Sequence, residues 1–173
     1  EQGLTYGQIG LVFAVQGLTN AVSRLPFGHL SDRVTHRTLL VVWGLLGVAA
    51  SLAGYGISQR PLHFILCAAV MGIGMGLTFT SVAALCVETV RPDHRALAMG
   101  GYNSAIYLGM MVSAAGLGPV IGLTGYKDGF LWTTLITVLI TGLAFLLMKN
   151  FSPPSVPPPG AQGGGRGRER GQY

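Results

Sequence analysis

The sequence predicts an all-α integral membrane protein, a polytopic bundle of five transmembrane helices. Its composition is the first reason, since 50% of the 173 residues are hydrophobic and only 10% are charged. A soluble domain of this length needs more charge to cover its surface, whereas a bilayer removes that requirement. Five apolar stretches are also long enough to cross a hydrocarbon core, which takes ~20 helical residues. Finally, the 27 glycines suit close helix packing in lipid, whereas the strands of a membrane barrel would alternate apolar and polar residues.

The five predicted spans cover residues 4–27, 38–57, 62–87, 96–122 and 129–148. The first contains Gln16 and Asn20, four residues apart on one helix face, and Arg24 continues this stripe. We expect Arg24 to snorkel to the membrane interface rather than to bind an anionic substrate. The second and fifth spans have no amide or charge at their centres.

The third span contains the sequence GIGMG at residues 72–76. A nucleotide-binding loop would follow a strand, whereas this run lies inside an apolar helix. Gly72 and Gly76 are therefore expected to pack against a neighbouring helix.

Lysine and arginine are unevenly distributed among the connections. Nine flank the first loop, the third loop and the last span: Arg24, Arg33, Arg37, Arg91, Arg95, Lys149, Arg166, Arg168 and Arg170. The second and fourth loops hold only Arg60 and Lys127. The positive-inside rule then predicts that the first loop, the third loop and the C-terminus are cytoplasmic. A membrane domain over 1–150 would be followed by a cytoplasmic tail, 151–173, whose Pro-, Gly- and Arg-rich sequence predicts disorder.

The net charge of +5 comes mostly from this bias and the tail, so the lipid bilayer is an expected partner and nucleic acid is not. The N-terminal sequence EQGLTYGQ has no basic region and no cleavage site, and so the first span is not predicted to be a signal peptide. Because residue 1 would start outside, further helices of the same bundle are expected upstream as partners.

The stretch GHLSDRVTHR joins the first two predicted spans. It resembles the signature of the major facilitator superfamily of secondary transporters, found after the second helix and, more loosely, after the eighth. The matching residues are Gly28, Leu30, Ser31, Asp32, Arg33 and Arg37. Thr35 and His36 stand where the signature has a glycine and a basic residue. A second stretch, VETVRPDHRALAMG, has Glu88 and Arg95 separated by six residues with Pro92 between them, which is similar to the corresponding later loop of this family.

The resemblance covers residues 4–150 and implies a major facilitator fold that transports a small solute by alternating access. It also implies a cytoplasmic gate whose ion pairs must break when the carrier opens inward. The implied gate residues are Gly28, Asp32, Arg33, Arg37, Glu88 and Arg95. A carboxylate at the interface is costly unless it is paired. The alternative is that the cations only anchor the loops and the acids are incidental.

Substrate contacts are expected from polar side chains at mid-membrane depth. A polar group is energetically costly there, so its presence points to a function. The candidates are Gln16, Asn20, Thr78, Asn103 and Tyr107, and Thr80 offers a further hydroxyl. Alternatively, the amides join helices to one another by hydrogen bonds. The five spans resemble helices eight to twelve of a twelve-helix carrier, or else helices two to six. The expected location is a plasma membrane of the bacterial inner-membrane type.

No nucleophile, metal cluster or paired-carboxylate site stands out in the spans, so neither an enzyme nor a cofactor is expected. Cys67 and Cys86 have no metal or redox spacing. The four histidines lack the paired spacing of a metal site. The remaining alternative to transport is a membrane sensor or scaffold of the same fold that transports nothing.

Overall fold

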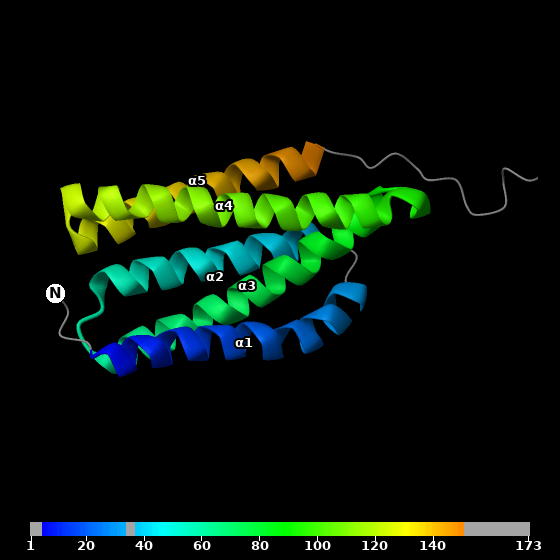
Figure 1. Ribbon diagram of the computed structural model, residues 1–173. Helices are drawn as coiled ribbons and strands as arrows, with labels where there is room; N and C mark the ends of the chain where they lie inside the picture. Colours follow the sequence, from blue (N-terminus) through cyan, green and yellow to red (C-terminus); the bar gives the residue numbers. More distant parts are fainter. Residues whose placement is uncertain (1–4, 34–36, 151–173) are drawn as a thin grey trace, which may run out of the picture.

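The computed structural model describes residues 5–33 and 37–150, apart from the side chains of 30–33 and 150. This part of the chain forms five α-helices and one short 3₁₀ helix: α1 Tyr6–Arg33, α2 Arg37–Ile57, α3 Pro61–Thr89, η1 Pro92–His94, α4 Arg95–Thr124 and α5 Tyr126–Asn150 (Figure 1). Each α-helix coincides with one predicted apolar segment. α1 continues to Arg33, so Gly28 and Asp32, which were expected in a loop, lie on its last turns. The tail, 151–173, lies outside the described residues.

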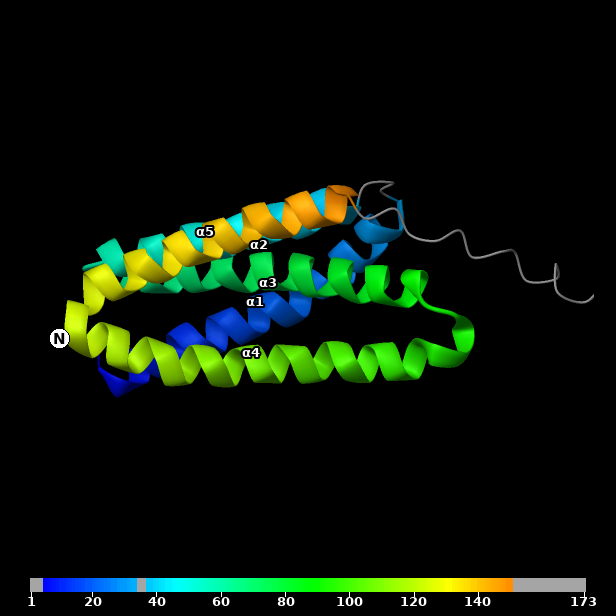
Figure 2. The ribbon, with the colours of Figure 1, turned by 90° about the horizontal axis from the view of Figure 1, so that it is seen from above.

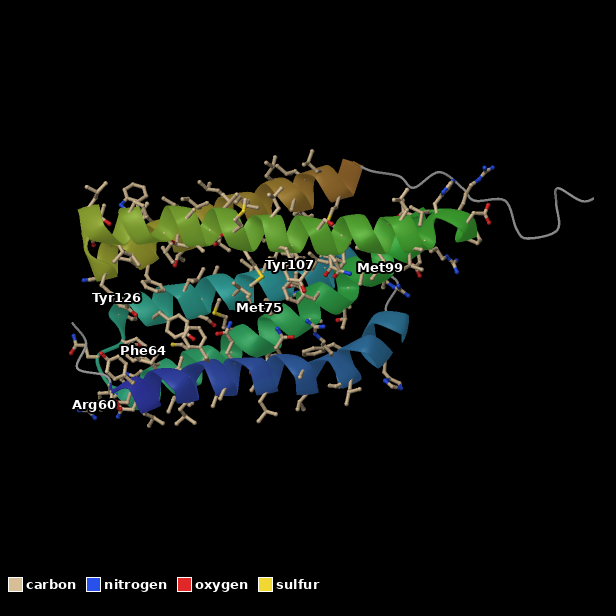
Figure 3. The ribbon with its side chains drawn as sticks, viewed as in Figure 1. Arg60, Phe64, Met75, Met99, Tyr107 and Tyr126 are labelled. Atoms are coloured by element: carbon tan, nitrogen blue, oxygen red, sulfur yellow. The ribbon has the colours of Figure 1, made fainter. Side chains whose placement is uncertain are left out.

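Successive helices run antiparallel along the bundle (Figure 1). α3 packs against α1, α2 and α4, while α5 packs against α2 and α4 (Figure 2). The C-terminal ends of α1, α3 and α5 lie with the N-terminal ends of α2 and α4 at one end of the bundle (Figure 1). We call this the cationic end, because Arg37, Arg91 and Arg95 belong to it. Arg60 lies at the opposite end (Figure 3). Which end faces the cytoplasm stays a prediction.

Small residues let α3 approach α1 and α2 on opposite faces. Gly72 and Gly76 face α1. A Cβ atom on Gly72 would lie 3.0 Å from the backbone nitrogen of Asn20, and a Cβ atom on Gly76 would lie 3.1 Å from the carbonyl oxygen of Asn20. Gly74 faces α2, where a Cβ atom would lie 2.7 Å from the carbonyl oxygen of Gly44. Helices in lipid gain little from burying apolar surface, so close van der Waals contact is a main source of their association. The predicted packing role of Gly72 and Gly76 is confirmed.

An aromatic cluster joins α2, α3 and α5 at the end of the bundle opposite the cationic end. The ring of Tyr55 lies 6.1 Å from that of Phe64 and 6.0 Å from that of Phe130, between centroids. Tyr126 is 4.7 Å from Phe130. Phe64 and Tyr126 mark this end of the bundle in Figure 3. The cluster fixes α5 against α2.

α4 is the most exposed helix, and none of its residues is buried within the described chain. Its last turn is capped by Gly125, whose N–H donates to the carbonyl oxygen of Ile121 at 2.8 Å. Gly125 has a φ of 86°, a conformation that glycine adopts without strain and that lets the chain reverse into α5. α4 therefore lies beside α3 and α5 with one long face open.

Four helical segments are long and apolar enough to cross a membrane: Arg37–Ile57, Pro61–Thr89, Pro92–Thr124 and Tyr126–Lys149. α1 has 28 residues, which is ample length, but Gln16, Asn20 and Arg24 lower its apolar character. That α1 also spans the membrane stays a prediction. Its polar residues face α3 and a pocket, as described next.

Candidate functional site: a pocket between α1, α3 and α4

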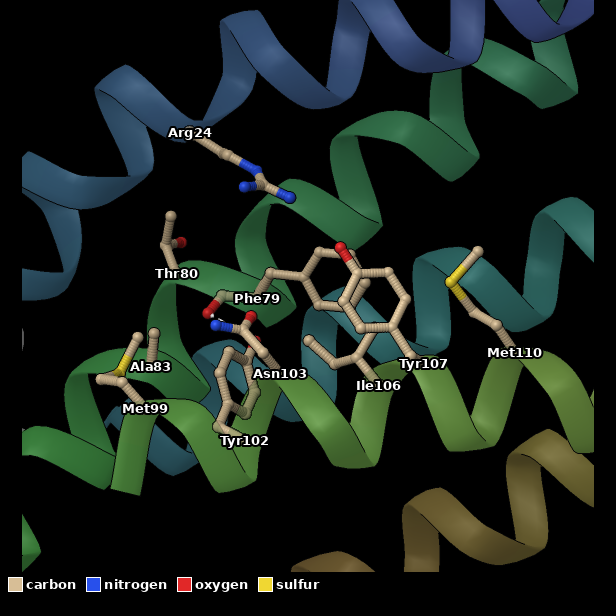
Figure 4. A pocket seen from close by; sticks show the side chains of 10 residues that line it. All are labelled: Arg24, Phe79, Thr80, Ala83, Met99, Tyr102, Asn103, Ile106, Tyr107 and Met110. Atoms are coloured by element: carbon tan, nitrogen blue, oxygen red, sulfur yellow. Dashed lines mark hydrogen bonds between the residues drawn. The ribbon is translucent and has the colours of Figure 1, made fainter. Parts of the chain in front are cut away.

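A pocket of about 380 Å³ lies between α1, α3 and α4 (Figure 4). Its lining combines one cation, an amide, a hydroxyl, aromatic rings and thioethers: Arg24, Phe79, Thr80, Ala83, Met99, Tyr102, Asn103, Ile106, Tyr107 and Met110. None of the described lining residues comes from α2 or α5. Such a mixture, mostly apolar with a few polar groups, is typical of a small-molecule site.

Arg24 supplies the charge of the pocket from α1. Its Nε donates to the side-chain Oδ1 of Asn20 at 2.9 Å, one turn back along the helix. Its guanidinium carbon lies 5.4 Å from the ring centroid of Phe79, so the cation faces the π-system of α3. Both contacts turn the guanidinium toward the middle of α1 and into the pocket (Figure 4). The Asn20 amide one turn away and the neighbouring ring hold the guanidinium in this direction. The expectation that Arg24 snorkels to the membrane interface stays a prediction.

α4 supplies the opposite wall. Asn103 and Tyr107 are four residues apart and both line the pocket, as does Tyr102 between α4 and α3. The Tyr102 hydroxyl donates to the backbone carbonyl of Phe79 at 3.1 Å. This bond ties α4 to α3 beside the ring that Arg24 contacts, so one segment of α3 positions both walls.

The other predicted binding residues lie at helix contacts rather than in the pocket. Gln16 Nε2 lies 3.6 Å from Met75 Sδ, across the contact between α1 and α3. Asn20 sits in the same contact and reaches the pocket only through Arg24. Thr78 is buried against Gly44 of α2, with its hydroxyl donating to the Gly74 carbonyl at 2.9 Å. Thr78 therefore faces away from the pocket, because two residues of helix separate its face from that of Thr80, which lines the pocket.

Sequence reasoning missed the apolar part of the lining. Phe79, Met99, Tyr102 and Ile106 look like ordinary residues of apolar helices, and no spacing distinguishes them from lipid-facing ones. The sequence feature that pointed to the pocket was the stripe of Gln16, Asn20 and Arg24. It correctly indicated which face of α1 is turned toward the other helices.

An ion pair joins two helix ends outside the pocket. Arg37 at the start of α2 lies 3.0 Å from Glu88 at the end of α3, between Nη1 and Oε1. The Arg37 side chain is 16% exposed and that of Glu88 is 55% exposed. The pair is thus partly shielded, at the cationic end of the bundle.

Comparison with known proteins decides the family, since the family model described as Major Facilitator Superfamily matches residues 1–171. The chain belongs to this superfamily. The chain is 30% identical over 146 residues to the inner membrane transport protein YajR of Escherichia coli (strain K12), a match that covers 84% of this chain and 31% of that protein. It is 28% identical over 148 residues to the methylenomycin A resistance protein of Streptomyces coelicolor, covering 84% and 30% of the two. It is also 28% identical over 153 residues to the multidrug resistance protein MdtL of Vibrio parahaemolyticus, covering 84% and 37%.

The match shows that this major facilitator chain is an integral membrane protein with the all-helical fold of a transporter family, as the sequence predicted. It spans about a third of the length of the relatives named above.

Of the implied gate residues of this major facilitator chain, the structure brings together Arg37 and Glu88. Within the described residues, no ion pair joins Glu88 to Arg95, which is exposed at the start of α4. The short helix η1, Pro92–His94, separates the two residues along the chain. Among the residues that the structure describes, none lies within 4 Å of the place where Gly28 would carry a Cβ atom. The side chains of Asp32 and Arg33 lie outside the described residues.

Proposed function

We propose that this protein moves a small organic solute across the membrane by alternating access, and that the pocket between α1, α3 and α4 forms part of the solute pathway. The observation that supports this most directly is the convergence of Arg24, Asn103 and Tyr107 from helices α1 and α4 on one hollow. Polar groups at membrane depth are costly, so a site that gathers them beside apolar walls suits an amphipathic solute. The relatives named for transport and for resistance to methylenomycin A and to multiple drugs agree with a small organic cargo.

The pair of Arg37 and Glu88 is the proposed gate element of this carrier. It joins α2 to α3 at the cationic end, so any movement that separates these helix ends must break it. A partly hydrated ion pair contributes about 1 kcal/mol, which corresponds to a roughly fivefold shift between two conformations. The gate would then set the balance between the two access states, with Asp32, Arg33 and Arg95 as further proposed members.

Transport is tested in the full-length protein, reconstituted into proteoliposomes loaded with a cell extract. Untargeted mass spectrometry then identifies solutes whose distribution changes with the protein present. We expect Asn103→Ala to abolish the change, because it removes the pocket amide. Leu139→Ala is the matched control, since Leu139 on α5 is 64% exposed and is not among the residues described as lining the pocket.

If the full-length protein changes the distribution of no solute, or if Asn103→Ala transports normally, the proposal is wrong. The first result would instead favour a sensor or scaffold of the same fold.

A further inference from the structure

Arg24 is held in a conformation that a membrane anchor does not need. A snorkelling arginine extends toward the nearer helix end, where water and headgroups solvate its charge. Here the Nε atom bonds to Asn20, one turn toward the helix centre, and the guanidinium faces Phe79. The two contacts fix both the direction and the plane of the guanidinium. The cation is therefore presented to the pocket.

The Arg24 cation has no carboxylate partner in the part of the chain that the structure describes. No acidic side chain is among the described residues that line the pocket. Glu88 is engaged by Arg37 at the helix ends, Asp93 belongs to η1, and Asp128 lies in the first turn of α5 at the opposite end. The Asn20 amide and the Phe79 ring orient the cation without neutralising it. A cation at membrane depth is stabilised most by an anion, which a solute can supply.

We propose that Arg24 is an anion-binding residue and that the transported solute carries a carboxylate or a related oxyanion on an organic body. This inference rests on the proposed function and names the substrate class of the same pocket. The unused Nη atoms of Arg24 would receive the anion in the bidentate geometry that a guanidinium favours. Asn103 faces this position from α4 (Figure 4). The rings of Phe79, Tyr102 and Tyr107 would contact the apolar body.

The test measures the charge preference of the pocket without requiring the natural solute. In the full-length protein with its native cysteines, including Cys67 and Cys86, replaced by alanine, Asn103→Cys places a thiol in the pocket. The probes are sulfonatoethyl methanethiosulfonate, an anion, and trimethylammonioethyl methanethiosulfonate, a cation. Each labelling rate is divided by the rate of the same reagent with mercaptoethanol, which removes the difference in intrinsic reactivity.

We expect the anion to label Asn103→Cys about tenfold faster than the cation on this normalised scale, because the charge of Arg24, which lines the same pocket, attracts the anion and repels the cation. Arg24→Gln should reduce the ratio to about one, and Arg24→Lys, which keeps the charge, should retain most of it. The control thiol is Gln59→Cys, exposed at the opposite end of the bundle. Its ratio should not change with Arg24→Gln.

An anionic lipid headgroup is the other source of the same chemistry, and bilayer composition distinguishes it. The rates are measured in phosphatidylcholine alone and in phosphatidylcholine with phosphatidylglycerol. A preference that persists in both supports a solute anion, and one that disappears with phosphatidylglycerol overturns that assignment in favour of a headgroup. If the anion and the cation label Asn103→Cys at similar normalised rates while Arg24 is intact, Arg24 does not bind anions. The proposed solute pathway would not be affected by that result. If neither reagent labels Asn103→Cys, water does not reach the pocket and the proposed pathway itself fails.

Discussion

Gly44 of α2 and Gly74 of α3 face each other where the two helices cross. A side chain on either glycine would point at the backbone of the other helix. A Cβ atom on Gly44 would lie 2.8 Å from the carbonyl oxygen of Gly74, and one on Gly74 would lie 2.7 Å from that of Gly44. Real Cβ atoms do not approach carbonyl oxygens this closely, so neither position admits any other residue unless the helices separate. Because α3 also carries the pocket wall with Phe79, this contact positions the site.

Gly74→Ala is predicted to destabilise the bundle by ~1–3 kcal/mol, the usual cost of forcing a methyl group into a packed contact. The measurement is the melting temperature of the full-length protein in detergent. Gly47→Ala is the matched control, because the nearest atom to its Cβ, Gly74 Cα, is at 3.7 Å, an ordinary contact. Equal melting temperatures for the two variants would contradict the close crossing of α2 and α3.

Phe130→Ala is predicted to loosen α5 from α2. The change removes two ring contacts, with Tyr55 and Tyr126, which together contribute about 1–2 kcal/mol. The melting temperature should fall, and limited proteolysis should cut the connection between α4 and α5 faster. Trp132→Ala, two residues further along the same helix and 55% exposed, should have a smaller effect, and a reversed order would argue against the cluster.

Tyr102→Phe is predicted to weaken the attachment of α4 to α3. It removes the hydrogen bond to the Phe79 carbonyl and should cost about 0.5–1 kcal/mol, as such bonds between membrane helices do. Tyr107→Phe is the comparison for stability, since the Tyr107 side chain is 70% exposed. Thermal stability measured on both variants checks the prediction, and it does not hold if Tyr107→Phe is the more destabilised.

Glu88→Gln is predicted to favour the conformation in which the cationic end is open. Losing an ion pair of about 1 kcal/mol shifts the two states roughly fivefold. Labelling of a cysteine at the helix ends, with membrane-impermeant reagents applied from each side, measures this shift. Asp93→Asn removes an exposed acid of η1 and is the control. The gate proposal loses its support if both variants label alike.

The sequence alone determined the fold class and the order of the helices, because apolar length and small-residue content are properties that a bilayer selects directly. It also indicated that Gln16, Asn20 and Arg24 share one inward face of α1, since a spacing of four residues fixes that geometry. The signature around Gly28 and Asp32 indicated the family that the sequence comparison confirmed.

Only the tertiary structure decided which polar residues face the pocket. Thr78 and Thr80 are two residues apart on one helix, and the sequence gives no reason to prefer either, but the crossing of Gly44 and Gly74 turns Thr78 into α2 and leaves Thr80 in the pocket. The direction of Arg24 depended likewise on contacts with Asn20 and Phe79. A long side chain has many rotamers of similar energy in isolation, and here the Phe79 ring of α3, together with the Asn20 amide of its own helix, selects among them.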